Sequence, residues 1–264
     1  MWLNSSSPIH KQDLVLRKPF VNTPGMLGFA PDPHSMPFLK HLGAFITNPI
    51  SFRPRQPAGN RVYLPFAGGF LLHTGLPNPG LKRTISRFKR RWASAPLPII
   101  VHLLAETPGT LAEIVQKLEG LENIMALEIG LSPMCDPPLL ETLLDAASGE
   151  LPVIVCLSPE QIPILQEKLK ELQPTAVHLS PPRGTLPTKT GEKVSGRLYG
   201  SATFPLMLHA IQFLLEAELK VIAYGGINAL WQVQTLLETG AMGVSLGEVL
   251  WKVDPGNVFI PTEK

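Results

Sequence analysis

The chain has 264 residues, 44% of them apolar, and its 23 lysines and arginines nearly balance 21 aspartates and glutamates. This composition excludes disordered, collagen-like and coiled-coil chains and indicates a folded globular protein. A net charge of +2 gives no field strong enough to make nucleic acid or an anionic membrane the main partner. Two cysteines are too few for a disulfide framework, which favours a reducing, cytoplasmic location. No run approaches the roughly 18 apolar residues of a membrane span.

The predicted elements begin irregularly. Residues 14–21 are expected to form a short β-hairpin at one end of the fold, and residues 25–30 and 43–47 are candidates for the first and second strands. The 28 prolines are about twice the average usage and predict many short, stiff loops.

From residue 97 onward, short apolar runs alternate with stretches of helical periodicity. The candidate strands are 98–103, 124–131, 153–157, 176–179, 221–223 and 243–246. The candidate helices are 110–118, 139–147, 159–172, 205–218 and 230–239, and residues 180–201 are interpreted as irregular. This alternation predicts a single (β/α)₈ barrel, with an open doubly wound sheet as the alternative. We expect an arm over residues 1–12, the barrel over 13–252 and a tail over 253–264.

Glycines follow the last two predicted strands. Gly225 and Gly226 come after strand 221–223, and Gly247 comes after strand 243–246. In a barrel, the loops after strands seven and eight commonly hold a phosphate, because glycine lets backbone N–H groups approach the anion. Glycine is also the default residue of tight turns, so a phosphate site and ordinary turns both stay open.

Segment 68–80, GGFLLHTGLPNPG, resembles the dihydroorotate dehydrogenase family pattern G-G-x-L-N-x-x-G-L-x-N-P-G without a gap. Segment 43–55, GAFITNPISFRPR, is similar to that family's G-A-V-V-T-K-S-I-T-x-x-P-R, and 127–132, 195–200 and 224–227 follow in the family's order. The likeness runs from about residue 13 to 251. It implies an FMN-binding barrel of the family's cytoplasmic class, which is dimeric or pairs with an iron-sulfur flavoprotein subunit.

The resemblance also implies positions for the ligands. The positions expected at the FMN are Gly28, Ala30, Thr47, Asn48, Gly200, Gly225, Gly226 and Gly247. The positions expected at the substrate are Leu72, His73, Gly75, Leu76 and Asn78. Because all of these segments end strands, we expect Asn48 and Gly225 at the same end of the barrel.

The departures from the family pattern are concentrated where chemistry would occur. The two lysines that contact the flavin match Asn48 and Cys156, and the position of the base matches Pro133, which has no ionisable group. The asparagines that bind the substrate match Leu72 and Gly130. Each lost partner in a buried site costs about 1 to 3 kcal/mol, and a lost base forfeits roughly 10² to 10⁴ in rate. We therefore expect no appreciable dihydroorotate oxidation.

Ser132 and Cys135 are weak candidates for a substitute base, since they flank the lost position. Cys135 would need a lowered thiol pKa, and the alternative is a small residue in a proline-rich loop. The seven histidines show no paired spacing typical of metal ligands, so no metal site is predicted. His73, His102 and His178 lie at or near strand ends and are candidates for pocket residues.

Charged groups raise two further questions. Glu248 stands where the family usually has Thr or Ser, and a carboxylate repels phosphate unless it turns away or is paired. If a phosphate-bearing ligand binds, we expect Glu248 to turn outward or to pair with Arg183, Lys193 or Arg197. Six cations between residues 82 and 91 could bind an acidic partner or nucleic acid, but a solvated helix face explains them more simply.

Two functions fit these observations. One is an FMN-dependent oxidoreductase that acts on a CH–CH group of an altered substrate. The other is a barrel without flavin or catalysis that serves as a binding or structural subunit. Both readings expect a small or phosphate-bearing ligand, neither a membrane nor a nucleic acid as partner, and a homo-oligomer or hetero-complex.

Overall fold

The structure, a computed structural model, describes residues 14–59, 62–252, 255 and 258–259. The expected N-terminal arm and most of the expected tail lie outside these residues, so the division of the chain stays a prediction.

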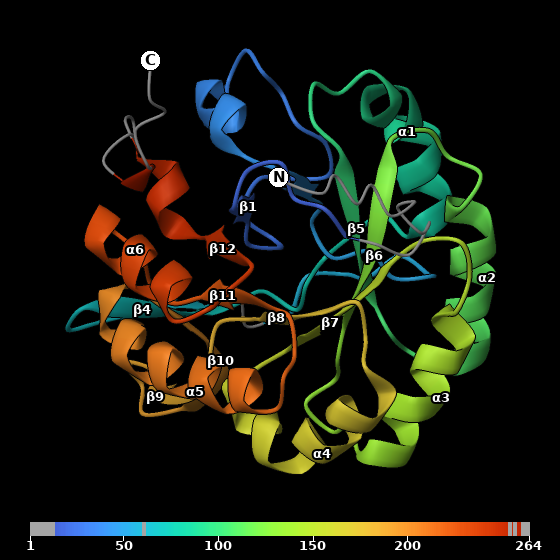
Figure 1. Ribbon diagram of the computed structural model, residues 1–264. Coiled ribbons are helices and arrows are strands. Elements are labelled where there is room, and N and C mark those ends of the chain that lie inside the picture. The colour runs from blue at the N-terminus through green and yellow to red at the C-terminus, as the bar shows by residue number, and fades with distance from the viewer. Residues whose placement is uncertain (1–13, 60–61, 253–254, 256–257, 260–264) are drawn as a thin grey trace, which may run out of the picture.

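A closed parallel sheet organises the described residues (Figure 1). Its strands in ring order are β1 (Phe20–Asn22), β2 (Phe45–Ile46), β5 (Ile99–Leu104), β6 (Ile124–Gly130), β7 (Val153–Leu157), β8 (Ala176–Leu179), β11 (Val221–Tyr224) and β12 (Gly243–Leu246). The ring closes where Val21 and Ala44 form a parallel bridge and the Gly43 N–H donates to the Phe20 carbonyl at 2.7 Å. The predicted (β/α)₈ barrel is confirmed.

Helices cover the outside of this barrel (Figure 1). They are α1 (Leu81–Ala93), α2 (Pro108–Leu118), α3 (Pro137–Ala147), α4 (Ile162–Leu172), α5 (Phe204–Glu216) and α6 (Leu230–Glu238). Short 3-10 turns η1 (Pro37–His41), η2 (Pro159–Gln161), η3 (Ser201–Thr203) and η4 (Glu248–Trp251) lie between the main elements. Several helices begin with a proline in the first turn, where its missing N–H leaves no bond unmade.

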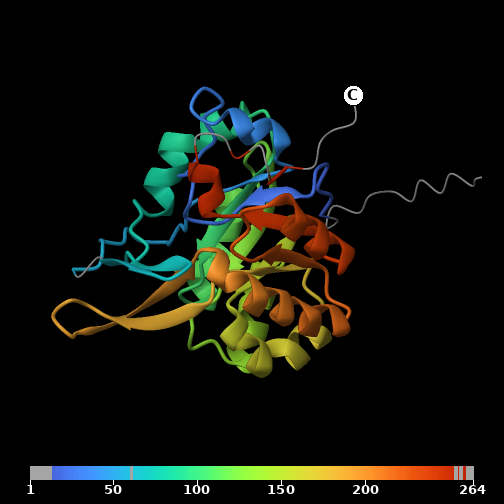
Figure 2. The ribbon, with the colours of Figure 1, turned by 90° about the vertical axis from the view of Figure 1, so that its left-hand side faces the viewer.

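A second, antiparallel sheet is inserted into the loops that follow two barrel strands. Its strands, in the order β3 (Val62–Phe66), β4 (Gly69–His73), β10 (Lys193–Tyr199) and β9 (Arg183–Pro187), come from the segments after β2 and β8. Both hairpins project from the same side of the barrel in Figure 2. Since loops after parallel strands leave from the carboxyl ends of those strands, this sheet lies at the end where barrel enzymes place their sites.

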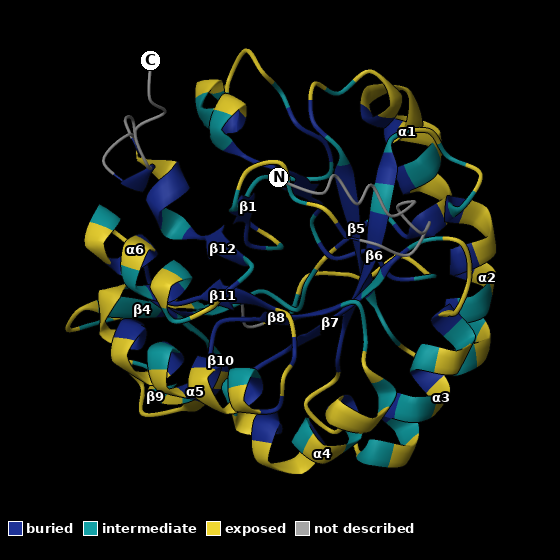
Figure 3. Cartoon of the chain, viewed as in Figure 1, coloured by how far each residue is buried: buried dark blue, intermediate teal, exposed yellow. Residues whose placement is uncertain are grey.

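The inside of the barrel has two layers of different chemistry, and Figure 3 shows its strands as buried. The lower layer is a separate apolar cluster, and seven of the eight strands or their flanking residues contribute to it. Residues from so many strands can meet only inside the barrel. The upper layer lies two residues further along five of these strands, on the same face because side chains alternate. The lower layer is Val21, Ala44, Ile46, Ile100, Ala126, Ile154, Ala176 and Ile222. The upper layer is His102, Glu128, Cys156, His178 and Tyr224.

Two expectations for the N-terminal region are wrong. Residues 14–19 contain no strand, and Phe20–Asn22 pairs in parallel with β12 instead of closing a hairpin. Residues 25–30 form turns, because Gly25 and Gly28 have φ angles of +89° and +92°, which interrupt an extended strand. The true first strand is therefore β1, and the antiparallel pairing lies in the inserted sheet.

The six cations between residues 82 and 91 lie on α1, mostly exposed. Arg91 donates to the Pro31 carbonyl at 3.0 Å, and Arg87 and Arg91 lie over the ring of Phe88. Part of this charge therefore holds local structure.

Candidate functional site

Two adjoining cavities open at the carboxyl ends of the barrel strands. The first has a volume of about 250 Å³ and is lined by Asn48, His102, Cys156 and Ser180 among others. The second has a volume of about 430 Å³ and is lined by residues of the inserted sheet and of the loop after β6. Both cavities share a wall made by Leu72, Thr74, Leu76, Arg197 and Tyr199. They form one candidate site, which we call the upper site.

The structure brings many of the residues expected at the substrate into this site. Leu72 and Leu76 line both cavities, while His73, Gly75 and Ser132 line the second. Asn48 lines the first cavity and follows β2, whereas Gly225 follows β11, so these two residues lie at the same end of the parallel barrel. The sequence motifs therefore assemble around one space.

Other predicted residues hold local structure, and among those that follow only Asn48 also lines a cavity. Asn78 accepts hydrogen bonds from Ser51 and from the Gly80 N–H, which fix the turn before α1. Thr47 is buried and accepts the His102 backbone N–H at 3.1 Å. The amide oxygen of Asn48 accepts the Gly28 N–H at 3.0 Å, so these two residues form one unit. Ala30 is part of the hydrophobic core.

Cys135 does not suit the role of a base. Its side chain is buried in the hydrophobic core and lines neither cavity. Burial raises the pKa of its thiol to about 11, with a smaller contribution from Asp136, so the thiol stays protonated at neutral pH. The loop after β6 therefore offers the upper site only the hydroxyl of Ser132 as a polar side chain, beside Pro133.

The expected phosphate end is closely packed. A Cβ added at Gly226, where φ is +61°, would lie 2.1 Å from the Gly200 carbonyl oxygen and 2.6 Å from the Thr203 hydroxyl. A Cβ at Gly247 would lie 3.1 Å from the ring of Tyr224, which is itself buried. The glycines are therefore needed for close approach of the chain to itself.

Glu248 neither turns fully outward nor pairs with the cations proposed for it. Its carboxylate accepts the Tyr224 hydroxyl at 3.4 Å, and among the described residues no ion pair to Arg183, Lys193 or Arg197 is formed. Burial raises the pKa of Glu248, opposed by hydrogen bonds from its own backbone and from the Gly200 N–H and by Tyr224. Glu248 therefore accepts the Tyr224 hydroxyl and the Gly200 N–H instead of a cation. The expectation for Glu248 concerns the protein with a phosphate-bearing ligand bound and stays a prediction.

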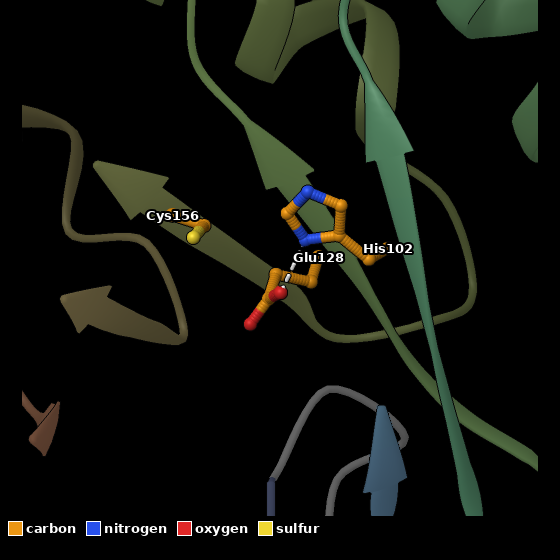
Figure 4. Close-up of side chains that lie close together, drawn as sticks. All are labelled: His102, Glu128 and Cys156. Atoms are coloured by element: carbon orange, nitrogen blue, oxygen red, sulfur yellow. Dashed lines mark hydrogen bonds and ion pairs between the residues drawn. The ribbon is translucent and has the colours of Figure 1, made fainter. Parts of the chain in front are cut away.

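Four upper-layer side chains from neighbouring strands meet next to the first cavity, and two of them, His102 and Cys156, line it. Figure 4 shows three of the four, His102, Glu128 and Cys156. Nδ1 of His102 and Nδ1 of His178 each hydrogen-bond one oxygen of the Glu128 carboxylate. Register pairs His102 with Glu128 on β5 and β6, and Cys156 with His178 on β7 and β8. Three of these side chains, His102, Glu128 and Cys156, place one nitrogen, oxygen or sulfur atom each within 4.8 Å of one another.

The electrostatics of this group follow from its burial. Burial alone would raise the pKa of Glu128, but the charge of His178 and the hydrogen bonds from His102 and His178 hold it below its usual range. Glu128 is then an ionised carboxylate that can only accept, so both Nδ1 atoms carry the proton. Burial and the charge of Glu128 raise the pKa of Cys156 well above its usual value, against a smaller effect of Arg197.

Three arginines line the upper site. Arg55, Arg183 and Arg197 border the second cavity, and Arg197 also borders the first. Arg55 pairs with Glu106 at 3.6 Å, whereas no described carboxylate lies within ion-pair distance of the other two guanidinium groups. Burial and the nearby charge of Arg197 lower the pKa of Arg183, with Glu160 acting in the opposite sense. Two neighbouring cations therefore face one cavity.

Sequence reasoning named His102, His178, Arg183 and Arg197 separately but missed Glu128, which joins the histidines. The available signal was the strand period. His102 and Cys156 each stand two residues after an isoleucine of the lower layer, so one face of each strand changes from apolar to polar.

Comparisons with known proteins agree with this fold. No protein-family model matches the chain. The chain is 26% identical over 264 residues to the catalytic subunit of dihydroorotate dehydrogenase B (NAD(+)) from Trichlorobacter lovleyi, covering 89% of this chain and 84% of that protein. It is 27% identical over 256 residues to the same subunit from Desulforudis audaxviator, covering 89% and 83%. A putative dihydroorotate dehydrogenase A (fumarate) from Aeropyrum pernix is 24% identical, with 92% and 85% covered.

A solved structure is also similar. The dihydroorotate dehydrogenase of Eimeria tenella, crystallised in complex with ferulenol, superimposes with a TM-score of 0.76 at 14% identity, covering 97% of this chain and 84% of that chain. At this identity the likeness speaks for the fold alone. In the described part of the chain, every helix is too short or too polar to cross a membrane.

Proposed function

Since the chain is a divergent member of the dihydroorotate dehydrogenase family, we propose that it keeps the family's barrel to bind a small organic anion in the upper site, without flavin chemistry. The observation that carries this proposal is the pair of guanidinium groups, Arg183 and Arg197, on one cavity wall with no described carboxylate paired to either.

The two arginines favour a carboxylate or phosphate ligand. Like charges held close together raise the free energy of the site, and an anion between them removes that repulsion. A guanidinium presents parallel N–H donors that match a carboxylate or phosphate in a bidentate manner. The second cavity, at about 430 Å³, lies within the usual 300 to 1,000 Å³ of small-molecule sites. A compact organic acid fits both the charge and the size.

The residues present do not fit FMN. Glu248 places a carboxylate where a barrel commonly holds a phosphate, and it already accepts the Tyr224 hydroxyl there. Cys156 and Asn48 supply no cation at the positions that match the family's flavin lysines, although reduced flavin needs a donor or cation beside its ring.

The second candidate is an FMN-dependent oxidoreductase that acts on a CH–CH group of an altered substrate. Arg197 favours it, because its guanidinium lines both cavities and would supply a positive charge that the missing lysines do not. The relatives, which are named as dehydrogenases, support the same reading. The visible absorbance of bound flavin distinguishes this oxidoreductase from the anion-binding barrel without flavin.

The expected setting follows the relatives. We propose a cytoplasmic protein that forms a homo-oligomer or joins a hetero-complex, because the matched relatives are named as catalytic subunits. Light scattering on the purified chain at increasing concentration tests the homo-oligomer: a mass that stays at 28.8 kDa would contradict it.

The binding proposal is tested by calorimetric titration of the purified full chain with orotate, used as a compact carboxylate probe. Arg197→Met should weaken binding about 10- to 100-fold, because hydrogen bonds to charged groups are worth about 1.5 to 3 kcal/mol. Arg90→Met, on the exposed face of α1, is the matched control and should bind as the wild type does. Equal affinity in all three proteins, or no heat of binding with orotate, succinate or sulfate, would contradict the proposal.

A further inference from the structure

The geometry points to a metal site inside the barrel: we propose that His102, Glu128 and Cys156 bind one divalent transition-metal ion, of which Zn²⁺ is the best match. This site uses other residues than the arginine pair of the proposed function and does not depend on that function.

The three ligand atoms are already gathered. The side chains come from three adjacent strands, β5, β6 and β7 (Figure 4). Register pairs His102 with Glu128, and Cys156 lies two residues further along β7, opposite Gly130. One imidazole nitrogen, one carboxylate oxygen and one thiol sulfur lie within 4.8 Å of one another, and all three residues are buried. Bonds of about 2.0 to 2.3 Å to a central ion bring such atoms only slightly closer together. Small side-chain rotations on a rigid parallel sheet therefore suffice.

The chemistry of the donors selects the metal. Imidazole, carboxylate and thiolate are together the ligand types of zinc, whereas Mg²⁺ and Ca²⁺ prefer oxygen alone. A carboxylate and a thiolate buried side by side repel each other strongly, but with a divalent cation between them the group is neutral. Binding of the ion displaces the proton of Cys156, and that proton leaves to solvent through the cavity.

His178 positions the carboxylate without being a ligand itself. Its Nδ1–H donates to the Glu128 oxygen that does not face His102, and its Nε2 is the one buried side-chain N or O atom of the described residues that has no hydrogen-bond partner. Groups of this kind, which hold a ligand from behind, commonly set metal affinity. A buried nitrogen without a hydrogen-bond partner, as at His178 Nε2, destabilises the core.

The site is also reachable. His102 and Cys156 both line the first cavity, so an ion can enter from the ligand end and keep one coordination position toward that space. Zinc sites with three protein ligands and one open position bind water or an anion there. Such an ion would lie at the first cavity, which Arg197 also borders.

Cobalt provides the test, because Co²⁺ takes zinc's geometry and its thiolate bond absorbs in the near ultraviolet. Metal-free full-length protein is titrated with Co²⁺, and then Zn²⁺ is added to displace it. We expect one equivalent of Co²⁺, a thiolate charge-transfer band, and loss of that band with Zn²⁺. Cys156→Ser should abolish the band. Cys135→Ser changes the only other cysteine of the chain, which is not a proposed ligand, and should leave the band unchanged.

A second variant keeps the test decisive if Cys156→Ser fails to fold. His178→Gln removes no proposed ligand, so the band should persist while competition with a chromophoric chelator shows affinity lowered about 10- to 100-fold. No band in the wild type overturns the proposal, as does a band that survives Cys156→Ser or is lost in Cys135→Ser. Orotate titration of the metal-free protein is a separate readout, so failure of the metal site and failure of anion binding are distinguishable.

Discussion

The two layers inside the barrel are built on the same strands and differ in what they contribute to the stability of the fold. The lower layer is aliphatic, and its burial stabilises the fold through the hydrophobic effect. The upper layer, two residues further along, buries an ionised carboxylate between two histidines, a group that apolar residues of similar volume often replace without loss. On each of these strands the inward-facing side chains change from apolar to polar within two residues. This change marks where the stabilising core ends and the candidate site begins. Polar groups retained at that cost are expected at functional sites.

The largest expected effect is at Glu128. In Glu128→Gln, a single amide oxygen replaces two carboxylate oxygens, and one histidine Nδ1–H is left without its acceptor in a buried position. We expect the free energy of unfolding in urea to fall by about 3 kcal/mol at pH 7, because breaking a buried ion pair commonly costs 3 to 5. A loss below about 1 kcal/mol would show that the upper layer is not held by this carboxylate.

The pH dependence sharpens this result. The pKa of Glu128 lies below its usual value of 4.5 in the folded state, at about 2. A lowered folded-state pKa contributes stability that is present above pH 4.5 and is lost as the pH falls toward 2. The stability difference between wild type and Glu128→Gln should therefore shrink over that window in acid titrations followed by circular dichroism. A difference that is constant with pH would contradict the ionised state.

The next effect concerns the crowded end above the upper layer. Gly226→Ala adds a Cβ 2.1 Å from the Gly200 carbonyl oxygen at a residue with φ of +61°, and should cost about 2 kcal/mol or more. Gly109→Ala in α2, where a Cβ meets nothing within 4 Å, is the control and should stabilise by up to about 1 kcal/mol. The melting temperatures of both variants, measured by thermal unfolding, test this expectation. Equal melting temperatures would mean that the phosphate end is open and not closely packed.

A smaller effect is expected from the carboxylate at that end. Glu248→Gln removes a negative charge beside the Gly200 N–H and should raise sulfate affinity about tenfold, the size of a screened charge interaction. Because burial raises the pKa of Glu248, wild-type affinity should increase as the pH falls through that pKa, while the variant stays flat. Calorimetry at several pH values measures both. The same pH dependence of sulfate affinity in the wild type and in Glu248→Gln would contradict this role of Glu248.

The smallest effect belongs to the lower layer. Ile154→Val removes one methyl group two residues before Cys156 and should cost about 0.5 to 1.5 kcal/mol. It should leave orotate and Co²⁺ binding unchanged, since the lower layer makes no polar contact. Altered ligand affinity in this variant would show that the two layers are coupled.

Much of the fold could be predicted from the sequence, because buried parallel strands read as short apolar runs. The strands 153–157, 176–179 and 243–246 were predicted with the bounds observed for β7, β8 and β12. All four strands of the inserted sheet, β3, β4, β9 and β10, escape prediction, since each is partly exposed and contains a proline or glycine that is typical of loops. β1 has only three residues, too few for a periodic signal.

The candidate site was less predictable than the fold. The glycine-rich segment led to Leu72, His73 and Leu76 because that motif is continuous in sequence. The group around Glu128 spans residues 102 to 178 and exists only because four neighbouring barrel strands bring these side chains together. Spacing rules for metal ligands search within one helix or loop, so they pass over ligands that the barrel alone brings together.

The visible absorption spectrum tests the central claim most directly. The full chain is incubated with excess FMN under reducing and oxidising conditions, desalted, and its flavin absorbance is compared with its protein concentration. We expect no stoichiometric flavin, because Glu248 holds a carboxylate at the expected phosphate end and Cys156 supplies no cation at the position that matches a flavin lysine. One flavin per chain after desalting would contradict the account and establish the oxidoreductase alternative.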